Sequence, residues 1–320
     1  MPNLVAYARS DTRVILSVSL NTALDKTLVV PRLTPGTRHT PDVRLTLAAG
    51  KAVNAARSLR LLGEEVRVVG FIAGDTGAHI EALLAEEGTS ADWIRLPSGE
   101  SRTCVIVVGD TPHPTEFNEP GPRVRAGDLL RLERAFLRRL PGSRFVLFSG
   151  RLAPGVPAGF YARLIGAAAA RGVPCALDTS EPALGPGLRA RPDIVKPNRV
   201  ELEELGLSTR ASRWRASLER LAAIGAGEVF ATLGEEGALM LSEGRVLHAV
   251  APPVRGGCPI GCGDTFLAGA VYGRLRGWPA DRRLRFATAL ASAGARTLGA
   301  GLFRRSDLRR TLPTVRLRRV

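Results

Sequence analysis

Lysine is nearly absent from this chain of 320 residues. It occurs only as Lys26, Lys51 and Lys196, although lysine and arginine together number 45. Arginine is a poor substitute where a compact, flexible ammonium group must meet a phosphate or a reacting oxygen. The positions that keep lysine are therefore candidates for a specific role.

Cysteine and long apolar runs are also scarce. The four cysteines at positions 104, 175, 258 and 262 form neither a CxxC pair nor a dense framework, so neither a disulfide scaffold nor a zinc site is expected. We interpret Cys258 and Cys262 as small buried thiols, with an oxidation-sensitive pair as the alternative. No segment approaches the ~20 apolar residues that span a bilayer, and residues 1–13 lack the apolar segment of a secretory signal. These absences predict a cytoplasmic protein without a membrane span.

Aromatic residues make up only 5% of the chain, which bears on its strong positive charge. The formal net charge of +15 and the isoelectric point of about 11.1 raise nucleic-acid binding as a hypothesis. However, no basic stretch alternates with aromatic residues as a base-stacking surface would. Seven arginines crowd into the Arg-rich tail, residues 303–320, and explain much of the charge. A nucleic-acid partner is therefore not expected.

The chain does contain a glycine-rich stretch, residues 256–270, which reads GGCPIGCGDTFLAGA. The glycines and the proline in its first half oppose regular structure. The apolar residues in its second half recur at helical spacing and predict a helix that begins near Gly261. Free N–H groups at such a helix start favour a bound phosphate, and Asp264 in the first turn could accept a proton from an attacking hydroxyl group. An ordinary glycine-rich turn, with an aspartate that suits the helix dipole, is the alternative.

Two further motifs lie near the ends of predicted elements. Asp25 follows the first predicted strand, residues 14–18, where ligands collect in open α/β sheets, although a turn aspartate is the alternative. Lys51 and Asn54 share a face near the start of a predicted helix, residues 48–59. That pair suits an anionic, hydroxylated ligand, with a solvated helix start as the alternative.

The segment KPNRVE, residues 196–201, ends a predicted strand and opens a helix. Asn198 and Glu201 have the spacing of a capping box. The functional alternative places Lys196 on nucleotide phosphates, and Asn198 and Glu201 near a Mg²⁺ ion held through waters. Residues 232–237 likewise end a strand in a glycine-bounded turn that is open to a nucleotide.

From residue 126 onward, apolar strands alternate with helices, which predicts an α/β fold with a mostly parallel sheet covered on both faces. The segments at about 22–47 and 97–122 instead contain short β-like pieces with proline and glycine, without a helical period. We expect them to form one small β-sheet lid on a single domain, residues 1–320.

Together these motifs resemble the ribokinase-like carbohydrate kinases, and within them the phosphofructokinase B group, which includes 1-phosphofructokinases and tagatose-6-phosphate kinases. The likeness extends from about residue 17 to residue 301, with the motifs in the family's order. The matching segments are NTALDK at 21–26, AGKAVNAA at 49–56, GESRT at 99–103, NEPGP at 118–122, KPNRVE at 196–201 and GCGD at 261–264. The resemblance implies a ribokinase-like three-layer α/β/α sandwich with a mostly parallel central sheet and a small β-sheet lid.

The resemblance also implies a role for each matched position. Asp264 would act as the general base, with the N–H groups of Gly261, Cys262 and Gly263 as an anion hole. Sugar hydroxyl groups would be held by Asp25, Gly50 and Asn54, and the phosphate of the sugar by Lys51 and Arg102. ATP and Mg²⁺ would be bound by Lys196, Asn198, Glu201, Thr232, Gly234 and Gly237, with Asn198 and Glu201 meeting the metal ion through water. Members of the family often pair as homodimers through the lid.

Several positions depart from the family's pattern. Ala49 and Ala52 replace glycines of the sugar loop, where added methyl groups could narrow the approach of the main chain to the substrate. Arg151 replaces a small residue and could add a phosphate contact or lie in solvent. Thr22 replaces a proline, and Cys262 an alanine. These departures bear on the choice of substrate rather than on the class of reaction.

We therefore predict an ATP- and Mg²⁺-dependent kinase that phosphorylates a hydroxyl group of a ketohexose phosphate, with fructose 1-phosphate as the first candidate and fructose 1,6-bisphosphate as the product. Two pocket cations, Lys51 and Arg102, favour a phosphorylated acceptor. Tagatose 6-phosphate and fructose 6-phosphate are the alternative acceptors. The alternative from another class is a catalytically degenerate sugar-phosphate sensor or nucleic-acid-associated regulator, suggested by the altered sugar loop and the Arg-rich tail.

Overall fold

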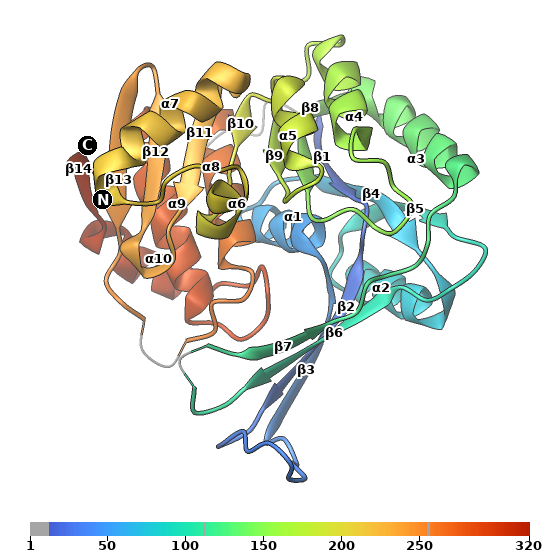
Figure 1. Ribbon diagram of the computed structural model, residues 1–320. Coiled ribbons are helices and arrows are strands. Elements are labelled where there is room, and N and C mark those ends of the chain that lie inside the picture. The colour runs from blue at the N-terminus through green and yellow to red at the C-terminus, as the bar shows by residue number, and fades with distance from the viewer. Residues whose placement is uncertain (1–12, 112, 255–256) are drawn as a thin grey trace.

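The computed structural model describes residues 13–111, 113–254 and 257–320. Its strands form two sheets, and helices flank the larger one (Figure 1). Residues 1–12, where no secretory signal is expected, and Gly256, which opens the glycine-rich stretch, lie outside the described residues. Among the described helices, none combines the length and the apolar character that crossing a membrane requires.

The large sheet is parallel through its centre and antiparallel at one edge. Neighbouring strands from β11 to β5 all run parallel, whereas β12, β13 and β14 are added in antiparallel fashion. Its order is β14 (Arg316–Arg319), β13 (Arg245–Val250), β12 (Ala238–Ser242), β11 (Glu228–Thr232), β10 (Ile194–Val195), β9 (Cys175–Asp178), β8 (Ser143–Ser149), β1 (Val14–Ser19), β4 (Val66–Ile72) and β5 (Ser90–Arg95).

Helices cover both faces of this sheet because its strands are apolar on both sides. Along β1, Leu16 and Val18 belong to one hydrophobic cluster and Ile15 to the other, and all three are fully buried. The first cluster includes residues of α3 (Ala126–Arg139), α4 (Phe160–Ala169), α5 (Leu184–Arg189), α6 (Arg199–Glu204) and α7 (Trp214–Ile224). The second includes residues of α1 (Lys51–Leu61), α2 (Gly74–Glu86), α8 (Cys262–Leu275), α9 (Ala280–Ala295) and α10 (Arg305–Thr311). The predicted three-layer α/β/α sandwich is confirmed.

The second sheet stands beyond these layers, at the bottom of Figure 1. Its order is β3 (Val43–Ala49), β2 (Ala23–Val29), β6 (Arg102–Val108) and β7 (Thr115–Asn118). The strands come from the two segments in which the sequence predicts a lid. Asp25 lies within β2, opposite Cys104 of β6, and is only 8% exposed. The turn-aspartate interpretation of Asp25 is therefore wrong.

Three elements were not predicted from the sequence. The strand β5 reads SADWIR, the helix α5 reads LGPGLR, and the strand β14 reads RLRR, so none has the composition typical of its structure. Each depends on its neighbours: β5 pairs with β4, Leu184 and Leu188 of α5 are buried in the first cluster, and β14 pairs with β13. Tertiary contacts thus override local preference at these places.

The helix predicted from residue 48 begins later than expected. Ala48 and Ala49 end β3, and α1 starts only at Lys51. Gly50 between them has a φ of 104°, a conformation that glycine adopts readily and other residues rarely do. The sharp turn at Gly50 brings the start of α1 to the end of the second sheet, where the candidate site lies.

Candidate active site

The helix α8 begins where the glycine-rich stretch predicts. Gly261 caps it with a φ of 75°, and a Cβ atom there would lie 2.7 Å from Cβ of Ala300, so only glycine fits. The N–H group of Cys262 donates to the carbonyl of Pro259 at 3.1 Å. In the described part of the chain, no backbone carbonyl accepts a hydrogen bond from the N–H groups of Gly261 or Gly263. Two of the three expected amides are thus free to meet an anion.

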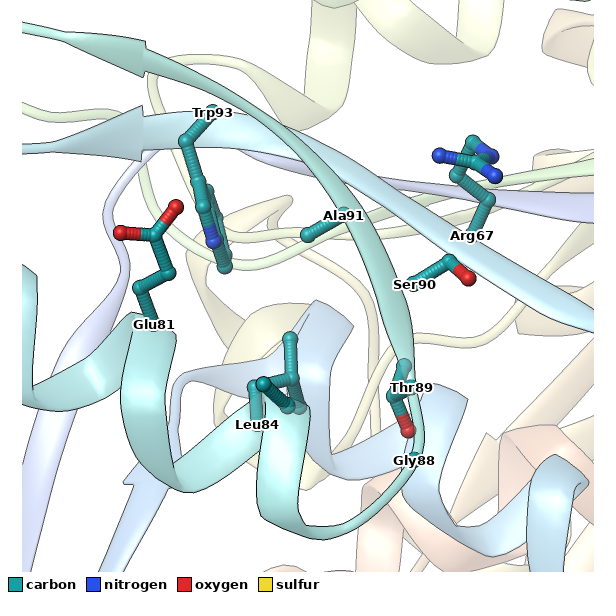
Figure 2. Close-up of a pocket in the computed structure, with 9 residues that line it drawn as sticks. Arg67, Glu81, Leu84, Gly88, Thr89, Ser90, Ala91 and Trp93 are labelled. Carbon is teal, nitrogen blue, oxygen red and sulfur yellow. The ribbon is translucent and has the colours of Figure 1, made fainter.

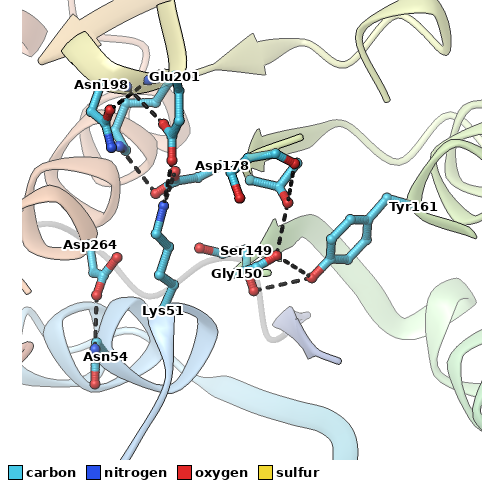
Figure 3. A network of polar contacts seen from close by, with 12 residues as sticks. Lys51, Asn54, Ser149, Gly150, Tyr161, Asp178, Asn198, Glu201 and Asp264 are labelled. Atoms are coloured by element: carbon cyan, nitrogen blue, oxygen red, sulfur yellow. Dashed lines mark hydrogen bonds and ion pairs between the residues drawn. The ribbon is translucent and has the colours of Figure 1, made fainter. Parts of the chain in front are cut away.

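Asp264 lies in the first turn of α8 and is only 5% exposed. Its Oδ2 atom accepts a hydrogen bond from Nδ2 of Asn54 at 2.8 Å (Figure 3). Burial, with a smaller effect from the nearby charge of Asp178, raises the pKa of Asp264 to about 7. The ammonium group of Lys51 and the bond from Asn54 oppose that rise. A carboxylate with a pKa near neutrality can accept a proton and release it again.

Two lysines converge on Asp178, which lies beside Asp264 (Figure 3). Nζ of Lys51 lies 3.2 Å from Oδ1 of Asp178, and Nζ of Lys196 lies 3.1 Å from Oδ2. Burial alone would raise the pKa of Asp178, but the two ammonium groups outweigh it and lower that pKa. Nζ of Lys51 also donates to Oε1 of Glu201 at 2.9 Å. The motifs at 51–54, 196–201 and 261–264 therefore meet in one place.

Sequence reasoning missed Asp178. It is the last residue of β9, and the rest of that strand, Cys175 to Leu177, is apolar and buried. An acidic residue that ends an apolar, parallel strand is the signal that could have found it, because ligands collect at the carboxyl ends of such strands.

Lys196 follows β10 and approaches the start of α8. Its side chain is almost fully buried, and Nζ lies 3.5 Å from the point that a Cβ atom on Gly263 would occupy. A lysine that faces the N-terminus of a helix concentrates positive charge there. The two features together make this point of the site suited to a phosphoryl group.

The capping box predicted at Asn198 and Glu201 is present. Oδ1 of Asn198 accepts a hydrogen bond from the N–H group of Glu201 at 2.9 Å, and Oε2 of Glu201 accepts from the N–H group of Asn198 at 2.8 Å. Among the described residues, no group of three or more acidic, histidine or cysteine side chains is arranged to hold a metal ion. These residues therefore fit a metal ion only where waters and substrate phosphates complete its ligands.

The remaining nucleotide candidates lie beside this helix start. Thr232 ends β11 and forms a parallel bridge with Asn198. Gly234 has a φ of 65° and open space where a side chain would stand. At Gly237 a Cβ atom would lie 2.0 Å from the carbonyl oxygen of Ala249, so packing against β13 by itself explains that glycine.

The candidates for the sugar lie where the second sheet meets α1. Nε of Arg102 donates to the carbonyl of Asn21 at 3.2 Å, and the same carbonyl lies beside Gly50. Burial raises the pKa of Asp25 to about 6, although the positive charge of Arg102 opposes the rise. Lys51 and Asn54 continue from Gly50 toward Asp264, which links this region to the start of α8.

The substituted positions of the sugar loop are packed inside the protein. Ala49 and Ala52 are fully buried, and Ala49 contacts Ala23 and Cys104. Their methyl groups therefore fill the interior around the loop. Arg151, in contrast, is exposed.

Of the two cysteines that are predicted to be buried thiols, Cys258 is buried and Cys262 is only half-buried. Sγ of Cys262 lies 3.9 Å from the carbonyl oxygen of Cys258, and neither residue forms a disulfide. Burial raises the pKa of both thiols, to about 12 for Cys262. The protonated thiol is the less reactive form.

A surface hollow lies apart from this site. It is lined by residues of β4, α2 and β5, including Arg67, Glu81 and Trp93 (Figure 2). Arg67 is paired with Asp92, and Glu81 with Arg95. Its charged side chains are thus already neutralised, and none of the candidate site residues lines it.

Comparison with known sequences adds an independent observation. A family model described as pfkB family carbohydrate kinase matches residues 21–305. The chain is 34% identical over 292 residues to a protein of Rhodobacter capsulatus named 1-phosphofructokinase, and the match covers 90% of this chain and 92% of that protein.

Comparison with solved structures gives the fold. Phosphofructokinase-2 of Escherichia coli in complex with substrates and products matches with a TM-score of 0.86 and 26% identity, over 94% of this chain and 99% of that chain. The tetrameric inhibited form of the same protein matches with a TM-score of 0.83 over 94% and 99%. Ribokinase of Arabidopsis thaliana complexed with ribose and ATP, at 22% identity, has a TM-score of 0.72 over 94% and 98%. The fold is therefore ribokinase-like.

Proposed function

This chain belongs to the pfkB family of carbohydrate kinases, and from that premise we propose that it phosphorylates a ketohexose phosphate, with fructose 1-phosphate as the acceptor and fructose 1,6-bisphosphate as the product. As a member of the family it is a phosphotransferase with a hydroxyl group as acceptor and ATP as donor. The finer assignment of the acceptor is supported by the likeness to the Rhodobacter capsulatus 1-phosphofructokinase.

One observation carries the proposal: Asp264 is a buried carboxylate with one oxygen held by Asn54, next to free amides at a helix start. We assign Asp264 as the base that takes the proton of the acceptor hydroxyl group. Among the described residues, no hydrogen bond occupies its other oxygen, Oδ1, which remains for that hydroxyl. The base would contribute roughly 10²–10⁴-fold to the rate.

The transferred phosphoryl group would meet the positive end of α8. The N–H groups of Gly261 and Gly263 and the ammonium group of Lys196 would stabilise its charge in the transition state. The N–H group of Cys262, the third that we assigned to the anion hole, would first have to leave the carbonyl of Pro259. Positioning and charge stabilisation would supply most of the catalysis.

The phosphate already on the sugar would be gripped chiefly by Arg102. Among the described residues, its guanidinium group donates only to the carbonyl of Asn21, so it can take a phosphate without losing an ion pair. Lys51 is held by Asp178 and Glu201 and would reach a phosphate only by exchanging those partners. Hydroxyl groups of the sugar would bind Asp25, Gly50 and Asn54, and the second sheet would serve as the lid.

ATP would lie along Lys196, Asn198, Glu201, Thr232, Gly234 and Gly237. Mg²⁺, when bound, neutralises charge on the phosphates. It typically keeps several waters and binds through one or two carboxylates together with substrate phosphates, which suits Asn198 and Glu201 as partners through water. The carboxylates of Asp178 and Glu201 both contact Nζ of Lys51, and they are the acidic side chains that would help to hold this ion.

A homodimer through the second sheet is part of the proposal. Phe117 of β7 is 62% exposed and Val43 of β3 is also exposed, so apolar side chains face solvent at both edges of this sheet. Both strands are edges of this sheet, and an edge strand presents N–H and C=O groups with which a strand of a second copy could pair. The Escherichia coli relative, whose structure in a tetrameric form is solved, shows that a protein of this fold can assemble.

The test is ADP release measured against a panel of fructose 1-phosphate, fructose 6-phosphate, tagatose 6-phosphate, fructose, ribose and a nucleoside. We expect the highest kcat/KM with fructose 1-phosphate. A preference for either 6-phosphate would correct the acceptor and leave the reaction class standing. Activity on free sugars alone would overturn the phosphate-binding role of Arg102. Absent turnover on every sugar, together with salt-sensitive DNA binding, would favour the regulator instead.

A further inference from the structure

A guanidinium group lies buried directly behind the candidate base. Arg57 stands on α1, three residues after Asn54, and its side chain is only 3% exposed. All five of its N–H donors have acceptors: Nε and Nη2 donate to Glu87, Nη2 also to the carbonyl of Ala48, and Nη1 to Oδ1 of Asn54 and the carbonyl of Ala300. An arginine side chain has no further donors to offer. Every donor of Arg57 is therefore satisfied in the observed arrangement.

This arrangement decides which way the amide of Asn54 faces. Arg57 can only donate hydrogen bonds, so the oxygen of the amide must turn toward it, at 3.3 Å from Nη1. The NH₂ group must then point the opposite way, where it donates to Oδ2 of Asp264 at 2.8 Å. Without Arg57, the amide could rotate and present its oxygen to the protonated form of Asp264, which would favour that form over the carboxylate.

The side chain of Arg57 also bonds the segment at Ala300, which packs against Gly261 of the glycine-rich stretch. Its bond to the carbonyl of Ala300, at 2.9 Å, ties α1 to the residues that pack against Gly261. Ser58, the next residue along α1, has one hydroxyl proton, and its Oγ lies 2.8 Å from the carbonyl oxygen of Gly301 and 3.2 Å from Oγ1 of Thr265. Arg57 thus bonds both the amide that holds the base and the segment that packs against Gly261.

We propose that Arg57, anchored by Glu87 at the end of α2, is a positioning residue for phosphoryl transfer, because it orients the Asn54 amide and through it the Asp264 carboxylate. Glu87 holds Nε at 2.7 Å and Nη2 at 2.6 Å, which fixes the plane of the guanidinium group. The inference rests on the proposed function, since it assumes that Asp264 is the base.

The test is the charge-conserving variant Arg57→Lys, measured as the pH dependence of kcat. Lysine has three donors on one atom and cannot serve Glu87, Asn54 and two carbonyls together. The freed amide no longer stabilises the carboxylate, so a higher pH is needed to deprotonate Asp264. We expect the acid limb of the profile to move up by about 0.5–1 pH unit and kcat to fall by about tenfold to a hundredfold, while the KM for ATP changes little.

The other charged and titratable groups that face Asp264 are unchanged in this variant. They are Asp178 at the end of β9, Lys51 on α1, Lys196 after β10 and Cys262 in α8 itself. Because lysine keeps the positive charge of arginine at position 57, a moved limb reports the orientation of the amide rather than a lost charge.

Arg283→Lys is the matched control. Arg283 on α9 is also buried and also holds a glutamate, Glu228, through two bonds of 2.5 Å and 2.6 Å. It contacts none of the site residues, so we expect a lower melting temperature with an unmoved acid limb. An equal loss of stability in Arg57→Lys with an unmoved limb would overturn the proposal.

Two further variants keep the test decisive. Should Arg57→Lys fail to fold, Glu87→Gln is the substitute, because it keeps the shape of the side chain and weakens its bonds to Arg57. We then expect a smaller upward shift of the acid limb of the kcat profile, and no shift would overturn the proposal. Asn54→Ser removes the amide that connects Arg57 to Asp264. Adding Arg57→Lys to this variant should therefore shift the acid limb of the kcat profile no further. An additional move there would mean that Arg57 acts by another route.

Failure of this inference is distinguishable from failure of the proposed function. If the wild type turns over none of the sugar phosphates, the proposed function is wrong. If Asp264→Asn retains turnover on them, the function stands, but the base is misassigned and this inference is wrong with it. If the wild-type limb depends on Asp264 but is indifferent to Arg57 and Glu87, only the positioning role falls.

Discussion

At the scale of single residues, the raised pKa of Asp264 should set the pH dependence of turnover if this carboxylate is the base that we propose. Because burial raises that pKa to about 7, and a base must be deprotonated to act, kcat should fall as the pH drops below about 7. The measurement is kcat from pH 5.5 to 9 with saturating sugar phosphate and ATP. Above pH 7, Asp264→Asn should lower kcat by roughly 10²–10⁴-fold while its circular dichroism spectrum is unchanged, and the difference from the wild type should shrink at lower pH. An acid limb near pH 4 would show that the carboxylate is not held as we describe.

The same carboxylate should weaken the folded protein as the pH rises. Its pKa moves from 3.8 in the unfolded chain to about 7 in the fold, so the folded state binds the extra proton between those values. Stability from this group therefore declines as the pH rises through that window. Asp264→Asn removes the penalty, and its melting temperature should exceed that of the wild type at pH 8 and approach it at pH 4. A variant that melts lower at pH 8 would contradict this account.

Arg102 offers a test of how the acceptor is recognised. Arg102→Ala removes the cation that we assign to the phosphate on the sugar, so the KM for fructose 1-phosphate should rise by about tenfold to a hundredfold, with the KM for ATP nearly unchanged. Arg44→Ala is the control, because Arg44 lies exposed on β3 of the same sheet. Equal effects of the two substitutions would indicate general electrostatic attraction rather than a specific contact.

At the scale of elements, the start of α8 depends on a glycine for two separate reasons. Gly261 has a positive φ, and Ala300 stands where its side chain would be. Gly277, just beyond the other end of α8, has a similar φ of 63° but open space around it. Gly277→Ala should cost only the backbone strain, about 1 kcal/mol, whereas Gly261→Ala should cost about 1–3 kcal/mol and most of the activity. Urea unfolding and kcat of both variants decide this, and equal stability losses would show that Ala300 yields.

Elements whose own residues determine them were predictable. The helix start at Gly261 and the capping box at Asn198 follow from local chemistry, and both are present. The strands β5 and β14 and the helix α5 were not predictable, because strand pairing or packing with segments elsewhere in the fold stabilises them. The same reason hid the position of Asp25, which depends on how β2 pairs with β6.

The sequence predicted which residues belong to the candidate site better than it predicted which of them contact one another. Local patterns indicated Lys51, Lys196 and Asp264 as separate candidates, since each stands at the start of a helix or the end of a strand. The family resemblance joined them in one site, and the structure brings them together. The pairing of both lysines with Asp178 depends on the order of strands in the sheet, which no local pattern contains. Arg57 was missed for a similar reason, because its acceptors come from four separate segments.

At the scale of the whole molecule, the proposed homodimer places the second sheet at the interface between two copies of the chain. Phe117→Asp places a charge on its exposed edge and should shift a dimer toward monomers, as measured by light scattering after size-exclusion chromatography. Val200→Asp is the control, because Val200 is as exposed, at 60%, but lies on α6. A wild type that is monomeric at micromolar concentration, or a dimer that Phe117→Asp leaves intact, would contradict the proposed interface.

The distribution of lysine across the two sheets has a practical consequence. Lys196 is enclosed and Lys51 is bound by two carboxylates, whereas Lys26 on β2 is exposed. Apart from the α-amino group, an amine-reactive fluorophore should therefore attach to one side chain, and that side chain stands on the sheet expected to close over the sugar. A fluorophore on Lys26 could thus report the opening and closing of that sheet in real time.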